Sequence, residues 1–212
     1  MYKIAILFDD KNNWLFEYFE KNNFKIENMH VDFFHDTNSV NNYDIVFILG
    51  YTKILSAKFL SQNSLNLVIH ESNLPEGKGF SPIQNQLLEG KNEIFICIIE
   101  AMEKVDSGDI ILQKKIYFEG TELYKEIRRK QADSTIDIIE KFLRSYPDFN
   151  RKQQVGKSSY YPKRKPSNQE LNINKSIIEN FNLLRIGNND LWPSFFKYKG
   201  KKYIIKISES EE

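Results

Sequence analysis

A histidine and an aspartate are the side chains in this sequence whose placement best suits acid–base chemistry. His70 ends an apolar run that begins at Leu65, and the polar, turn-forming segment ESNLPEGKG follows directly. This pattern predicts a buried strand that ends in a loop. Asp106 opens a second turn a few polar residues after another apolar run, Ile94 to Ile99. Two consecutive strands would therefore place one imidazole and one carboxylate on loops that could converge.

An imidazole beside a carboxylate can move protons near neutral pH. His70 could donate a hydrogen bond to an oxyanion or act as a base, since an ordinary histidine pKa of about 6.5 suits either role. Asp106 could hold that imidazole in one tautomer, stabilise its charged form and accept a proton through water. Taken singly, each residue has a simpler interpretation: a hydrogen-bonded histidine at a strand end, and a common turn.

Apolar runs that alternate with helix-spaced segments surround these two residues. The run Asp44 to Leu49 is apolar on both faces, which is typical of a strand inside a parallel sheet. The alternation predicts an α/β fold with a Rossmann-like, mostly parallel sheet and flanking helices. Ligands bind at the carboxyl ends of strands in such sheets, so residues 50–52, 70–79 and the Asp106 turn are expected on one rim. The strands are expected at Tyr2 to Phe8, Phe24 to Met29, Asp44 to Leu49, Leu65 to His70, Ile94 to Ile99 and Lys115 to Phe118.

Capping and breaking residues predict where two helices begin and end. Ser81 stands before a proline and can cap the free amides of a first helix, and Gly90 suits its end. Thr121 is expected to cap a long helix that residues 133–134 can break into two pieces. That helix should end at Tyr146, because the next residue is proline.

The chain is expected to have three parts. Residues 1–147 form the main domain, residues 148–170 a basic linker, and residues 171–212 a small helix and hairpin region. The last part is too small to fold alone and should dock on the main domain. The linker is either solvated chain or a contact for a diphosphate, because Lys163 and Arg164 could form charge-assisted bonds with phosphate oxygens.

The composition argues against several classes of protein. The 30 basic and 29 acidic side chains give a formal net charge of +1, so no overall field favours nucleic acid or a membrane surface. The single Cys97 lies in an apolar run and cannot form an internal disulfide. The first residues turn acidic too soon for a signal peptide, and no apolar run approaches a membrane span. A cytoplasmic protein without a metal site is expected.

The segment that carries both residues resembles the folate-dependent formyltransferase family. The family pattern is Asn-x-His-x-Ser-x-Leu-Pro, a basic residue with Gly, then Pro, Asp-x-Gly and often Gln. The segment YYPKRKPSNQELN and the final YKGKKYIIKI are also similar to the tail of transfer-RNA and sugar formyltransferases. The matching core residues are His70, Ser72, Leu74, Pro75, Lys78, Gly79, Pro82, Asp106, Gly108 and Gln113.

The resemblance implies a core like that of methionyl-tRNA formyltransferase, with 10-formyltetrahydrofolate as the cofactor and His70 and Asp106 as catalytic residues. It places the folate between the loop after the third strand and the aspartate turn; for Tyr51, surface packing is the alternative. The implied cofactor-binding residues are Tyr51, Thr52, Ile54, Ser72, Leu74, Val105 and Asp106. The substrate-binding residues proposed with them are Asn73, Lys78, Gly79, Lys163 and Arg164.

One departure from the family pattern affects catalysis. The family's catalytic asparagine falls at Val68, whose side chain cannot donate a hydrogen bond to an oxyanion. Loss of one such donor costs about 2.7 to 4 kcal/mol in other enzymes. A neighbour such as Ser72, Asn73 or Asn85 could compensate, or backbone amides could complete the oxyanion site. The remaining alternative is an inactive enzyme.

The loop HESNLPEGKGFSP is most similar to the branch that formylates precursors of pseudaminic-acid-type sugars, usually UDP-linked. The expected function is therefore formyl transfer to the amine of a nucleotide-linked amino-dideoxy sugar for a surface glycan. We expect no region that matches the nucleic-acid-contacting domain of the transfer-RNA enzymes, and FDDKNNW does not match the phosphate loop of glycinamide ribonucleotide enzymes. Alternatives are formylation of transfer-RNA-bound methionine, a non-catalytic folate-binding relative, and a hydrolase that releases formate. A homodimer is frequent in the family.

Overall fold

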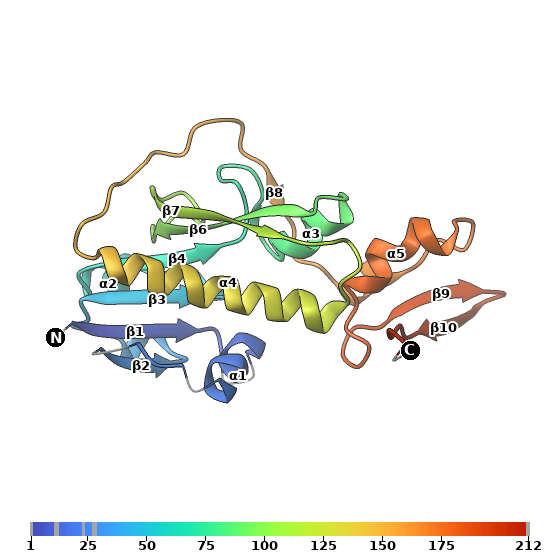
Figure 1. Cartoon of the computed structure of the whole chain (residues 1–212), viewed down its shortest axis with the longest axis horizontal. Coiled ribbons are helices and arrows are strands. Elements are labelled where there is room, and N and C mark those ends of the chain that lie inside the picture. The colour runs from blue at the N-terminus through green and yellow to red at the C-terminus, as the bar shows by residue number, and fades with distance from the viewer. Residues whose placement is uncertain (1, 11–12, 23, 27–28, 211–212) are drawn as a thin grey trace.

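A six-stranded sheet with the order β2-β1-β3-β4-β6-β7 forms the body of the protein (Figure 1). This architecture comes from a computed structural model, which describes residues 2–10, 13–22, 24–26 and 29–210. Strands β2, β1, β3 and β4 are parallel, whereas β6 runs antiparallel to β4 and β7 antiparallel to β6. The predicted α/β fold with a mostly parallel sheet is confirmed. The strands are β1 Lys3–Phe8, β2 His30–Phe34, β3 Ile45–Leu49, β4 Asn66–His70, β6 Glu93–Glu100 and β7 Ile110–Tyr117.

Helices cover both faces of the sheet because its strands are apolar on both sides. Along β1, Ile4, Ile6 and Phe8 are buried in the larger core, to which helix α4 also contributes. The alternate residues Ala5 and Leu7 belong to a second core with residues of α2. Figure 1 shows α4 running along the sheet, with α1 near the end of β1. The helices are α1 Trp14–Lys21, α2 Ala57–Ser61, α3 Pro82–Leu88 and α4 Tyr124–Ser145.

The second strand was predicted too early in the chain. Residues 24–26 are not a strand, residues 27–28 lie outside the described residues, and β2 begins at His30. Aromatic packing accounts for the difference: Phe24 contacts Phe19 of α1, with ring centroids 4.7 Å apart. Phe24 therefore packs on the helix that precedes it rather than in the sheet.

Helix α4 runs without the predicted break at residues 133–134. The carboxylate of Asp133 accepts a hydrogen bond of 2.6 Å from the hydroxyl of Tyr18, so a tertiary partner satisfies it without disturbing the helix backbone. The predicted cap at Thr121 is also wrong, because the helix begins at Tyr124 with Glu126 accepting from the amide of Leu123. The predicted end at Tyr146 is confirmed.

Helix α3 begins after Ser81, as expected, but the serine does not cap it. Ser81 has a left-handed backbone with φ of 49°, and its side chain makes no capping hydrogen bond. The side-chain amide of Asn85 instead donates to the carbonyls of Phe80 and Ser81. The amide of Gly90 bonds the carbonyl of Leu87, so the predicted end of this helix is confirmed.

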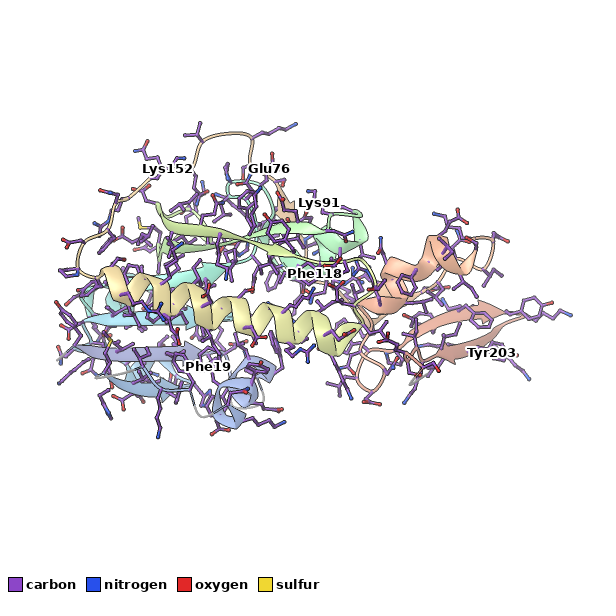
Figure 2. The ribbon with its side chains drawn as sticks, viewed as in Figure 1. Phe19, Glu76, Lys91, Phe118, Lys152 and Tyr203 are labelled. Carbon is purple, nitrogen blue, oxygen red and sulfur yellow. The ribbon has the colours of Figure 1, made fainter. Side chains whose placement is uncertain are left out.

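The last part of the chain carries helix α5, Ile177–Arg185, and a hairpin of β9, Ser194–Tyr198, with β10, Lys201–Ile205. The hairpin points away from the sheet in Figure 1, and Figure 2 shows Tyr203 on it, far from the buried Phe19 of the main body. A buried arginine joins this part to the body: Arg185 lies 3.5 Å from the carboxylate of Glu122. In the described part of the chain, no helix is long and apolar enough to cross a membrane.

Candidate active site

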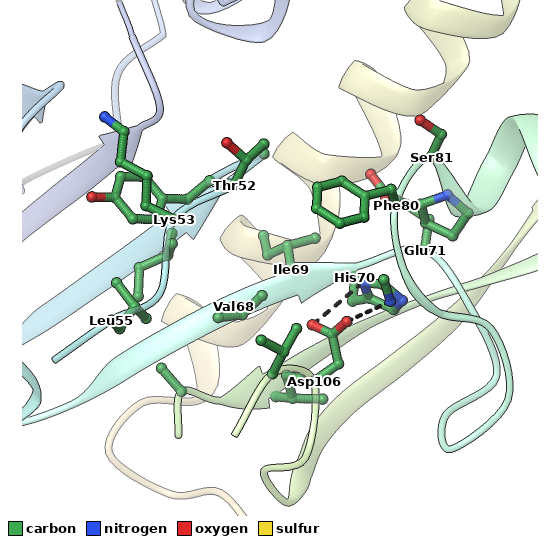
Figure 3. Close-up of a pocket in the computed structure, with 18 of the residues that line it drawn as sticks. Thr52, Lys53, Leu55, Val68, Ile69, His70, Glu71, Phe80, Ser81 and Asp106 are labelled. Carbon is green, nitrogen blue, oxygen red and sulfur yellow. Dashed lines mark hydrogen bonds and ion pairs between the residues drawn. The ribbon is translucent and has the colours of Figure 1, made fainter. Parts of the chain in front are cut away.

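A cavity of about 490 Å³ lies beside the ends of β3 and β4. Its walls come from the loop after β3, the end of β4, the start of α3, the turn after β6 and one side of α4. Figure 3 shows the imidazole of His70 and the carboxylate of Asp106 facing each other at this cavity. Concave sites of this size that mix apolar walls with a few polar groups are typical of small-molecule binding.

The two ring nitrogens of His70 have different partners. Nε2 lies 2.8 Å from the carbonyl oxygen of Gly77, and a carbonyl can only accept, so Nε2 carries the proton. Nδ1 lies 3.7 Å from Oδ1 of Asp106, which is longer than a hydrogen bond. In the neutral imidazole Nδ1 therefore has a free lone pair beside a buried carboxylate. A proton that arrives on Nδ1 creates a cation that this carboxylate stabilises.

Asp106 lies near His70, but the strand that precedes it does not run in the predicted direction. Strand β6 is antiparallel to β4, so Glu100 at its end lies opposite Leu67 rather than beside the carboxyl end of β4. The following turn folds back toward His70, and Oδ2 of Asp106 accepts from the amide of Gly79 at 2.8 Å. Asp106 has φ of 49°, a left-handed conformation that aspartate tolerates better than most residues. The turn therefore lines the same cavity as residues 50–52 and His70, as expected, although it does not follow a parallel strand.

The turn after Asp106 requires a glycine. A Cβ at Gly108 would lie 1.8 Å from the carbonyl oxygen of Glu100, so no other residue fits while that oxygen stays in place. Gly79 is similarly enclosed, because it has φ of 92° and a Cβ there would lie 2.5 Å from the carbonyl oxygen of Tyr161. The loop after His70 and the Asp106 turn thus both depend on close backbone packing.

The expected linker, residues 148–170, holds both loops. Strand β8, Tyr160–Tyr161, pairs with β5, Lys78–Gly79, and the hydroxyl of Ser159 accepts from the amide of Gly77 at 2.8 Å. The side chain of Gln154 donates to the carbonyls of Asp106 and Gly108, at 3.0 and 2.8 Å. Two adjacent tyrosines with β propensity were the signal in the sequence for this strand. We call residues 154–161 the loop clamp.

The residues predicted to bind the cofactor divide into two groups. Tyr51, Thr52, Ile54 and Val105 line the cavity together with Asp106. Thr52 also donates to the carboxylate of Asp9 at 2.6 Å. Ser72 and Leu74 are buried and are not among the lining residues. Leu74 packs with Cys97 and Ile99, so it anchors the loop after His70 on strand β6.

The residues predicted to bind substrate are also dispersed. Gly79 lines the cavity, and burial lowers the pKa of the adjacent Lys78, although the Asp106 carboxylate acts in the opposite direction. Asn73 lines a separate cavity of about 350 Å³. Lys163 lies over the ring of Phe80, with its Nζ 5.8 Å from the centroid. Arg164 donates to the side chain of Gln169 at 2.7 Å and does not line the main cavity.

Val68 lines the cavity, and the three side chains expected to replace the missing asparagine do not. Asn85 donates to backbone carbonyls, and Asn73 accepts from Gln113 at 3.1 Å. Gln84 does line the cavity: it is buried, and its Nε2 has no hydrogen-bond partner among the described residues. The only feature of the sequence that could have identified Gln84 as a cavity residue is its place two residues after Pro82, on the first turn of α3.

Sequence reasoning also missed Glu71, Arg128 and Gln131, which line the cavity beside α4. In the described residues, no group of three or more histidine, cysteine, aspartate or glutamate side chains is placed to hold a metal ion.

The fold and the cavity define an α/β protein with an imidazole and a carboxylate at a small-molecule site. The sequence model of the family described as Formyl transferase matches residues 9–141, and the chain belongs to this family. A methionyl-tRNA formyltransferase of Caldicellulosiruptor saccharolyticus is 31% identical over 176 residues, which are 80% of this chain and 54% of that protein. The chain thus spans about half the length of this curated relative.

Two solved structures have a similar fold. The methionyl-tRNA formyltransferase from Clostridium thermocellum superposes with a TM-score of 0.80 at 18% identity, covering 100% of this chain and 94% of that chain. A 4-N formyltransferase from Francisella tularensis superposes with a TM-score of 0.70 at 18% identity, covering 100% of this chain and 99% of that chain.

Proposed function

We propose that this protein transfers a formyl group from 10-formyltetrahydrofolate to the amine of a nucleotide-linked amino-dideoxy sugar. The observation that carries the proposal is the His70 and Asp106 pair at the cavity of a chain that belongs to the formyl transferase family. Folate is the formyl donor of this family, and the loop that contains Tyr51, Thr52 and Ile54 is the proposed place for its ring system.

The proposed reaction joins the acceptor nitrogen to the formyl carbon and breaks the bond between that carbon and N10 of the folate. Nδ1 of His70 takes the proton that the attacking amine loses, because Nε2 is occupied by Gly77. Asp106 stabilises the imidazolium that results. The imidazolium then returns the proton to N10 as the folate leaves. The proton, the formyl group and both nitrogen atoms are thereby accounted for.

The tetrahedral intermediate carries an oxyanion, and Val68 cannot donate to it. The amide of Gln84 is the proposed donor, because Gln84 lines the cavity and its buried Nε2 has no hydrogen-bond partner among the described residues. A buried donor without a partner costs about 1 to 3 kcal/mol, so a ligand oxygen that satisfies it recovers that free energy on binding.

Two acceptor classes are consistent with these relatives. A sugar acceptor is supported by the match along 99% of this chain to a solved structure described as a sugar N-formyltransferase from Shewanella, and by the loop that begins at His70. The finer proposal is a UDP-linked precursor of a pseudaminic-acid-type sugar. The second candidate is transfer-RNA-bound methionine, which the curated relative from Caldicellulosiruptor saccharolyticus favours.

Release of tetrahydrofolate from 10-formyltetrahydrofolate, followed by absorbance, tests the proposal against a panel of UDP- and dTDP-linked amino sugars and methionyl-tRNA. Turnover with a sugar is expected, and His70→Ala should abolish it. His30→Ala is the matched control, because His30 is exposed and lies 3.0 Å from Asp32 on the surface.

Other results would replace the proposal. Turnover with methionyl-tRNA alone would establish the second candidate. Formate release without an acceptor would indicate a hydrolase. Folate binding without turnover of any substrate would leave a binding relative.

A further inference from the structure

A second polar array lines the same cavity on the side of α4. The guanidinium of Arg128 donates through Nη1 to Oε1 of Gln131 at 2.9 Å, and Nε2 of Gln131 donates to Oε1 of Glu71 at 2.5 Å. All three residues line the cavity. Glu71 directly follows His70, so the array begins next to the proposed base. We call these three residues the α4 array.

The arginine of the α4 array is held in place by aromatic rings. Its guanidinium carbon lies 4.4 Å from the ring centroid of Trp14 and 5.2 Å from that of Tyr124. Trp14 also lines the cavity. The Nε of Arg128 is buried without a hydrogen-bond partner in the described part of the chain. Cation–π contacts with two rings therefore hold the guanidinium of Arg128 in place while its Nε remains without a partner among the described residues.

Both charges of the α4 array lack a counter-ion among the residues that the structure describes. Arg128 forms no ion pair with a carboxylate there, and Glu71 forms none with a basic side chain; the neutral amide of Gln131 separates them. Partly buried charges are costly unless they are paired. A cavity that keeps one cation and one anion at a set separation suits a ligand with the opposite charges.

We propose that the α4 array recognises the acceptor, with Arg128 binding an anionic oxygen group and Glu71 binding the amine as an ammonium. This inference rests on the proposed function. A guanidinium binds phosphate or carboxylate oxygens through two parallel hydrogen bonds, so the anionic group is one of these. Glu71 holds the acceptor as an ammonium, which first loses one proton to water to give the neutral amine. Nδ1 of His70 then takes the second proton when this amine attacks. The acceptor is therefore an amine whose own scaffold carries a phosphate or carboxylate.

Steady-state kinetics with the full chain test whether Arg128 binds the acceptor or the folate. Arg128→Met should raise KM for the charged acceptor about tenfold or more, because it removes charge-assisted hydrogen bonds, while KM for the folate stays within about twofold. Arg129→Met is the control, since Arg129 is the exposed neighbour on the same helix. Arg128→Lys keeps the charge without the planar fork and should fall between the two. An increase confined to the folate KM would overturn the proposal.

Binding of small anions in the absence of folate tests the role of Arg128 independently of the proposed formyl transfer. Calorimetry with pyrophosphate and with malonate, without folate, asks whether wild type binds a phosphate or a carboxylate and whether Arg128→Met loses that binding about tenfold. Equal binding by Arg128→Met and wild type would overturn the role of Arg128, even if sugars are formylated. Loss of binding in Arg128→Met would support it, even if the tested sugars are not substrates.

The role of Glu71 has its own test. Glu71→Gln keeps the shape and the bond to Gln131 but removes the charge. It should lower kcat/KM about tenfold for an amine acceptor, with the largest loss at pH values where that amine is protonated. A loss that is the same across the pH range would overturn the binding of an ammonium.

Discussion

The two ring nitrogens of His70 have different hydrogen-bonding roles, which decide where the imidazole can accept a proton. The carbonyl of Gly77 holds the proton on Nε2, so the other nitrogen is the one that can accept a proton in the cavity. The carboxylate of Asp106 faces that nitrogen while it is itself held by the amide of Gly79. Proton acceptance and charge stabilisation are thus assigned to two different side chains.

Asp106→Asn tests the charge without disturbing the turn. Asparagine tolerates the left-handed backbone and can still accept from the amide of Gly79, whereas its side chain cannot stabilise an imidazolium. We expect kcat to fall at least about a hundredfold with folate affinity retained. Single-turnover kinetics and a folate titration would measure the two quantities. An unchanged kcat would mean that the charge at Asp106 is not needed.

Gln84→Leu should separate stability from activity. Leucine removes a buried donor that has no partner among the described residues, so the free energy of unfolding should be unchanged or rise by about 1 kcal/mol. The same change should lower kcat about tenfold or more if this amide binds the oxyanion. Chemical denaturation and steady-state kinetics on one preparation give both values. Loss of stability with normal kcat would show that Gln84 only supports α3.

At the scale of elements, the loop clamp holds two loops that are distant in sequence. Residues 154–161 pair with β5 and bond the carbonyls of Asp106 and Gly108. The amide of Gly79 in turn donates to the carboxylate of Asp106, so the loop clamp, the loop after His70 and the Asp106 turn form one connected unit. Activity should therefore depend on a segment that bonds the backbone of Asp106 and Gly108 rather than the reacting side chains.

Gln154→Leu removes both hydrogen bonds from the clamp to the aspartate turn. We expect kcat to fall about tenfold, because the carboxylate of Asp106 loses its fixed position, while the melting temperature changes little. Gln153→Leu is the control, since Gln153 is the exposed neighbour of the same type. Equal kcat in the two variants would show that the turn holds Asp106 without the clamp.

At the scale of the whole molecule, a buried charged network joins the last part of the chain to the sheet. Glu122 accepts from the amides of Glu119 and Gly120 and pairs with Lys130 and Arg185. Burial by itself would raise the pKa of Glu122, but the bonds from Lys130 and the backbone amides lower it to about 2. The carboxylate therefore stays charged in the folded protein well below the pH at which it would protonate in an unfolded chain.

This depressed pKa predicts an acid-sensitive contribution to stability. The contribution is present above the ordinary carboxyl pKa of 4.5 and is lost as the pH falls from there to about 2. We expect a loss of about 2 kcal/mol in the free energy of unfolding over that range from this residue. Urea unfolding at several pH values would measure it. Glu122→Gln should flatten this part of the curve, and parallel curves for the two proteins would contradict the assignment.

The sequence by itself determined four of the strand-forming segments and the loop that follows His70. Apolar runs at β1, β3, β4 and β6 are local patterns, so each strand could be placed without knowledge of its neighbours. The end of β4 at His70 was predicted for the same reason.

Only the tertiary structure decided how these segments meet. The direction of β6, the pairing of β8 with β5 and the approach of Asp106 to His70 each join residues far apart in the chain. The α4 array likewise needs α4 to lie beside the end of β4. No local pattern encodes such contacts, because they depend on which apolar faces pack together and on which backbone groups remain to be bonded.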